Sequence, residues 1–120
     1  MAGIVAQNYG EALFELAQES GREDRFKKEL CELEELLASN VDLNLFLKHP
    51  KIGKEAKKEV LIKIMNDADP YLKNFVQLLI DKSRFSHFND IVKVFVKRYN
   101  ELRHIEVAYV QSASQLSQEE

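Results

Sequence analysis

The chain has almost no cysteine for covalent cross-links and no long apolar segment. Its 120 residues include a single cysteine, Cys31, which excludes an internal disulfide framework and suits a reducing compartment. No apolar run approaches the ~20 residues of a membrane span. A secretory signal has a basic segment before its apolar residues, and this sequence has none there. The sequence therefore predicts a cytosolic protein that does not insert into a membrane.

Residues with catalytic or metal-binding chemistry are few and scattered. His49, His87 and His104 lie far apart, and none has a second ligand-type residue at metal-binding spacing. The four glycines are too dispersed to form a phosphate-cradling loop. Carboxylates fall beside lysines, which is typical of solvated ion pairs. We expect no enzymatic activity, no cofactor and no metal, and we expect Cys31 to be a half-buried, inert thiol.

The sequence is instead rich in amphipathic helical patterns, separated by its few glycines and prolines. With 45% hydrophobic residues and a net charge of −3, it has the composition of an ordinary globular domain. Side-chain N-caps are expected from Asp24, Asn40, Asp69 and Ser86. The helices are expected over 4–19, from Asp24 to Ser39, from Asn40 to Pro50, over 53–65, over 70–82, and from Ser86 to Leu102. The pattern predicts an all-α fold, a compact six-helix bundle over residues 1–104.

The first helix has a wider apolar face than packing on one core requires. Its apolar side chains cover about 200°, whereas a surface helix needs a stripe only a little wider than about 100°. The face divides into an outer stripe of Val5, Tyr9, Ala12 and Leu16 and an inner stripe of Ala6, Gly10, Leu13, Phe14 and Ala17.

The helix over 70–82 divides in the same way. Its outer stripe is Tyr71, Phe75, Leu78 and Lys82, and its inner stripe is Leu72, Val76, Leu79 and Ile80. Either both helices are central and bury both stripes, or one stripe from each lines a groove for an amphipathic partner helix. Tyr9 and Ala12 favour the groove, because an aromatic anchor with a polar tip lies beside a small residue that permits close approach.

A lysine-rich stretch from Lys48 to Lys63 offers a different function. Its cations are His49, if protonated, and Lys48, Lys51, Lys54, Lys57, Lys58 and Lys63. They could contact phosphates, but Glu55 and Glu59 are interleaved and no aromatic side chains are placed to stack on bases. We therefore expect a solvated helix face and no nucleic-acid binding; the alternative is a weak nucleic-acid-binding bundle or a soluble helical adaptor.

The pattern changes after His104. Residues 105–112 alternate β-branched or aromatic side chains with others, which predicts a strand. Ser117 and Glu120 have the spacing of a capping box, the signature of a helix start. We expect residues 105–120 to be a linker, a strand and the start of a truncated second domain; the alternative is a disordered tail.

Several segments, taken in order, resemble the delta subunit of F-type ATP synthase, called OSCP in mitochondria. Residues 9–17, YGEALFELA, resemble the opening helix of that family, and residues 46–50, FLKHP, resemble the run closing its third helix. Residues 74–85 and 106–120 resemble two later family motifs. The chain differs at Gly10, where the family usually has alanine, and at Ser83, where it usually has glycine.

The resemblance implies a stator subunit at the top of the peripheral stalk, on the cytoplasmic face of the bacterial plasma membrane. In that family the amino-terminal domain holds the N-terminal helix of an alpha subunit between its first and fifth helices. The outer stripes defined above would form this groove. A second domain joins the membrane-anchored b subunits, so that the catalytic head does not rotate with the rotor. The subunit itself carries out no bond chemistry.

Overall fold

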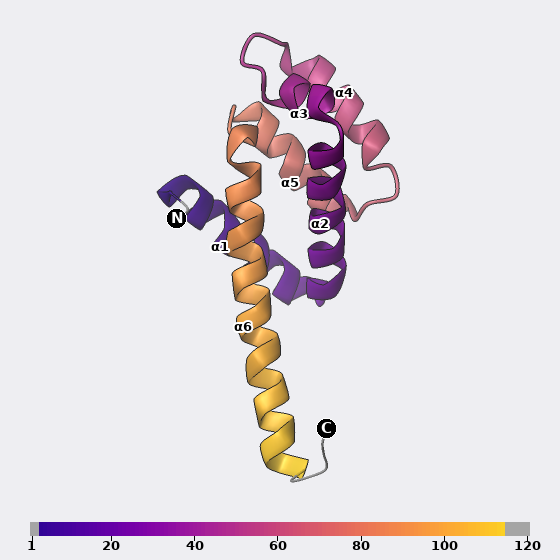
Figure 1. Cartoon of the computed structure of the whole chain (residues 1–120). Coiled ribbons are helices and arrows are strands. Elements are labelled where there is room, and N and C mark those ends of the chain that lie inside the picture. The colour runs from indigo at the N-terminus through magenta and orange to yellow at the C-terminus, as the bar shows by residue number, and fades with distance from the viewer. Residues whose placement is uncertain (1–2, 115–120) are drawn as a thin grey trace.

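The computed structural model describes the backbone of residues 3–114 and the side chains of residues 3–104. These residues form six α-helices and one 3-10 turn, with no strand among them, so the all-α prediction is confirmed. The elements in order are α1 (Ile4–Ser20), α2 (Glu23–Ser39), α3 (Val41–Lys48), α4 (Lys54–Ile64), α5 (Pro70–Asp81), η1 (Phe85–His87) and α6 (Phe88–Ser114) (Figure 1).

The core joins helices that are distant in sequence. α1 packs mainly across α6, α2 packs on both of them, and α4 packs on α5. Phe14, Phe26 and Phe95, from α1, α2 and α6, are almost fully buried and meet edge to face or stacked. The ring centroids of Phe14 and Phe95 lie 5.4 Å apart. Because aromatic pairs at this separation are favourable beyond their buried area, they fix these three helices together.

At Gly10, α1 lies in close contact with α6. A Cβ atom at this position would lie 2.5 Å from Val94 Cγ1 and 3.2 Å from the carbonyl oxygen of Ile91. Only glycine leaves room for the two helices at this separation, so Gly10 does more than weaken its helix.

α1 and α5 end in the same way. Gly21 has φ 68°, its N–H donates to Gln18 O, and the next N–H, of Arg22, donates to Ala17 O. At the end of α5, Ser83 has φ 58°, with Arg84 in the place of Arg22. There the amides of Ser83 and Arg84 donate to the carbonyls of Ile80 and Leu79. Both ends are left-handed caps that favour glycine, so Ser83 holds a strained conformation.

Only one of the four expected N-cap bonds forms. Asp69 accepts from the amide of Tyr71, as predicted. Asp24 does not cap α2, because the helix begins at Glu23 and leaves Asp24 in its first turn, where it accepts from Tyr99. Asn40 occupies the N-cap position of α3, but its amide donates back to Leu36 O. Ser86 lies inside η1, because α6 begins only at Phe88.

The strand expected over 105–112 is wrong, since α6 continues as a helix to Ser114. A strand needs a neighbouring strand for its hydrogen bonds, and the described residues contain none, whereas a helix satisfies its own backbone. The capping box at Ser117 and Glu120 lies outside the described residues.

Candidate partner-binding face of α1 and α5

The structure separates the two stripes of each helix as the sequence predicted. Every residue of the inner stripes of α1 and α5 is buried. No residue of the outer stripes is buried: Tyr71 and Leu78 are 46% and 40% exposed, Ala12 and Lys82 are exposed, and the remaining four are half-buried. Both helices therefore turn one apolar stripe inward and one outward. We call the eight outer-stripe residues the outer face: Val5, Tyr9, Ala12, Leu16, Tyr71, Phe75, Leu78 and Lys82.

Two aromatic rings bring the two halves of the outer face together. Tyr9 of α1 and Phe75 of α5 meet edge to face, with ring centroids 6.1 Å apart. Both rings pack on the core from its surface and stay half-buried. The face thus combines apolar side chains from both helices.

Two arginines that the sequence analysis missed flank this face. The guanidinium of Arg22, just after α1, lies 5.1 Å from the ring centroid of Tyr71 on α5. Reciprocally, Arg84, just after α5, lies 5.8 Å from the ring of Tyr9 on α1. Such cation–π contacts orient the tyrosines. In the sequence, these two arginines share one feature: each directly follows the residue that caps its helix in a left-handed conformation, Gly21 or Ser83.

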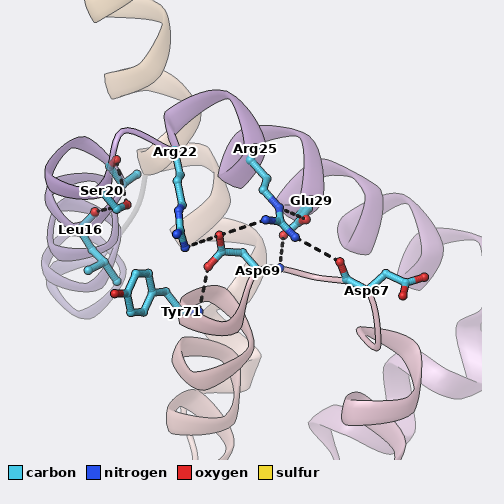
Figure 2. A network of polar contacts seen from close by, with 9 residues as sticks. Leu16, Ser20, Arg22, Arg25, Glu29, Asp67, Asp69 and Tyr71 are labelled. Atoms are coloured by element: carbon cyan, nitrogen blue, oxygen red, sulfur yellow. Dashed lines mark hydrogen bonds and ion pairs between the residues drawn. The ribbon is translucent and has the colours of Figure 1, made fainter.

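A buried carboxylate fixes the start of α5 against α2 (Figure 2). Asp69 is fully buried; its Oδ2 lies 2.9 Å from Arg22 and 3.6 Å from Arg25, and its Oδ1 caps the Tyr71 amide. Glu29 accepts from the Asp69 amide and from Arg25, and the latter bond raises the pKa of Arg25 above its ordinary value. Because Arg22 bonds Asp69 and also covers Tyr71, this network sets the position of one end of the outer face.

The described residues hold no group of acidic, histidine or cysteine side chains that could bind a metal ion. His49 is exposed, with its Nδ1 accepting from the Lys51 amide; His87 lies in η1 and His104 on α6. Cys31 is half-buried, as expected. No helix in the described part of the chain is long and apolar enough to cross a membrane.

Comparison with known proteins identifies the family. The family model described as the ATP synthase delta (OSCP) subunit matches residues 5–120. The ATP synthase subunit delta of Oceanobacillus iheyensis is 36% identical over 117 residues, which are 98% of this chain and 65% of that protein. The subunit delta of Microcystis aeruginosa is 37% identical over 114 residues, 94% of this chain and 63% of that protein.

The chain is thus shorter than the relatives it matches, spanning 65% and 63% of these two. The matches nevertheless cover nearly all of this chain, including α1 and α5 with their outer stripes. The chain belongs to the ATP synthase delta (OSCP) subunit family.

Proposed function

We propose that this chain is a non-catalytic stator component of an F-type ATP synthase, in which the outer face binds the amphipathic N-terminal helix of an alpha subunit. One observation supports it above all: both α1 and α5 carry a largely apolar stripe that the bundle buries only in part. An amphipathic helix laid on such a surface gains the hydrophobic free energy that the isolated bundle forgoes.

The shape of the outer face suits a helical partner. Tyr71 and Leu78 are the most exposed of its large apolar side chains and lie two turns apart on α5. Ala12 lies on α1, where a small side chain lets a partner backbone approach. Lys82 and Arg84, both exposed at the end of α5, supply cations for acidic residues of the partner.

The proposed complex sits on the cytoplasmic face of the bacterial plasma membrane without inserting into it. We assign residues 1–104 to the head-binding domain and residues 105–120 to the start of a second domain. That second domain would bind the b subunits and complete the link that keeps the head from rotating.

Ala12→Asp tests this assignment. The side chain is exposed, so the free domain should lose only about 0.5–1 kcal/mol of helix propensity. Binding would strip water from the new carboxylate at a cost of several kcal/mol, which should abolish binding of a synthetic alpha N-terminal peptide in calorimetry.

Two control variants make the result specific. Ala38→Asp places the same charge at an exposed alanine of α2 and should leave peptide binding unchanged. Leu13→Asp buries a charge in the inner stripe, where the leucine is 1% exposed, and should lower the melting temperature sharply. Normal peptide binding by a folded Ala12→Asp variant would refute the assignment of the outer face.

A further inference from the structure

The lysine-rich stretch from Lys48 to Lys63 contributes side chains to a pocket. A cavity of about 580 Å³ lies between the α3–α4 loop and the turn after α5. Its polar lining is made of ammonium and hydroxyl groups, with no acidic side chain among the described residues that line it. These groups belong to Lys48, Lys51, Lys54, Lys57, Ser83 and Ser86.

Lys57 is the unusual member of this set. It is only 9% exposed, although lysine is almost never buried without a partner. No described residue forms an ion pair or accepts a hydrogen bond from its ammonium group. Helical side chains lean toward the N-terminus of their helix, so Lys57 points along α4 toward Gly53, which also lines the pocket.

The N-terminus of α4 adds further donors to the same place. The helix begins at Lys54 and its N-cap, Gly53, supplies no side-chain acceptor. The first amides of the helix therefore remain available to an anion, and the helix dipole favours negative charge there.

The neighbouring lysines of α4, Lys54 and Lys58, already have partners at the end of α5. Lys58 pairs with the carboxylate of Asp81 at 2.9 Å, and this hydrogen bond raises the pKa of Lys58. Lys54 donates to the Asp81 carbonyl, which anchors its stem beside the pocket. Lys57 is thus left as a largely buried side chain whose ammonium group keeps contact with solvent and has no protein partner among the described residues.

We propose that this pocket binds a phosphate-class oxyanion, either a small free phosphate or the headgroup of an anionic phospholipid. A phosphate group would satisfy the Lys57 ammonium and the α4 amides together, and would offset the repulsion among the lysines that line the cavity. The four glycines of the chain form no glycine-rich phosphate-binding loop; here lysine ammonium groups would replace it.

Nuclear magnetic resonance titration of the ¹⁵N-labelled chain with sodium pyrophosphate tests the proposal, with sodium chloride holding the ionic strength constant. We expect saturable shifts of the amides of residues 53–57. Lys57→Met keeps an apolar stem and removes the charge, so it should weaken binding about tenfold or more. Lys63→Met removes an exposed lysine of α4 outside the pocket and should bind as the parent does.

Sedimentation with vesicles distinguishes the source of the phosphate. Binding to phosphatidylglycerol but not phosphatidylcholine vesicles, lost in Lys57→Met, indicates a lipid headgroup; saturable pyrophosphate binding without vesicle binding indicates a free anion. If Lys57→Met melts early, Lys51→Met, at an exposed lining position, replaces it. Equal losses in the pocket variant and Lys63→Met, or no binding in either arm, would overturn the proposal.

Discussion

At the scale of single residues, two side chains hold positions that ordinary sequence preferences do not favour. Ser83 adopts a left-handed conformation at the end of α5, and Asp69 is a fully buried carboxylate at its start. The first stores strain, whereas the second is compensated by arginine and amide donors. Substituting each should change stability in opposite directions.

Ser83→Gly should stabilise the chain by about 0.5–1 kcal/mol. A residue with a Cβ atom is disfavoured at φ 58°, and glycine relieves that cost, less the entropy it adds to the unfolded chain. Urea denaturation measures the change. Gly21→Ala is the matched control, because no atom lies within 4 Å of the added Cβ and only the backbone strain acts. It should destabilise by about 1 kcal/mol; a Ser83→Gly variant no more stable than the parent would mean that the Ser83 backbone is not strained.

Asp69→Ala should lower the free energy of unfolding by about 3 kcal/mol. The variant loses an N-cap, worth about 1 kcal/mol, and a charged hydrogen bond to Arg22, worth about 1.5–3 kcal/mol. Asp69→Asn keeps the cap and loses the charge, so it should cost about 1 kcal/mol less than Asp69→Ala. Equal losses in the two variants, measured by chemical denaturation, would show that the cap contributes nothing.

Residue roles were predictable from the sequence only where they follow from local pattern. The Asp69 cap was predicted, because aspartate directly before proline is a local signal. The burial of Lys57 and the contact between Gly10 and Val94 were not, because each depends on an element distant in sequence.

At the scale of the helices, α1 and α6 cross closely because Gly10 has no side chain. Gly10→Ala should destabilise the bundle by about 1–3 kcal/mol, because its Cβ would overlap Val94 in a buried contact. Val94→Ala alone should also destabilise, by opening a void. In the Val94→Ala background Gly10→Ala should cost less than in the parent, because the overlap with Val94 Cγ1 is gone. It should still destabilise, because the Cβ atom that alanine keeps at position 94 would remain 2.6 Å away.

A double-mutant cycle from thermal and urea unfolding checks this coupling. Additive effects of the two substitutions would mean that α1 and α6 do not meet at Gly10.

Helix positions and buried faces followed from the sequence, while helix ends often did not. The 3.6-residue periodicity identified every inner-stripe residue of α1 and α5, because burial of a helix face is encoded by spacing. The Asp24 and Ser86 caps failed because a shift of one or two residues in the helix start moves the cap elsewhere. The strand failed because alternation cannot reveal whether a pairing strand is present.

At the scale of the whole molecule, the far half of α6 lies apart from the rest of the bundle. The molecule measures 57 × 29 × 26 Å, and α6 runs out beyond the other helices (Figure 1). We expect the 120-residue chain to unfold cooperatively as one bundle and to bind the alpha N-terminal peptide. It should show no measurable binding to b-subunit ends in calorimetry, because the proposed b-binding domain is the second one. Tight binding of b to this chain would show that the two roles are not divided between domains.

The close crossing of α1 and α6 has a mechanical consequence. Gly10 brings the two helices into direct contact, and protein interiors are nearly incompressible at such contacts. A compressive load that presses α1 against α6 would pass through this crossing and, in parallel, through α2, which packs on both helices, and neither α3 nor α4 would lie on its path. The stiffness of the joint between α1 and α6 would then depend on this crossing and on α2, and α3 and α4 could soften without loosening it.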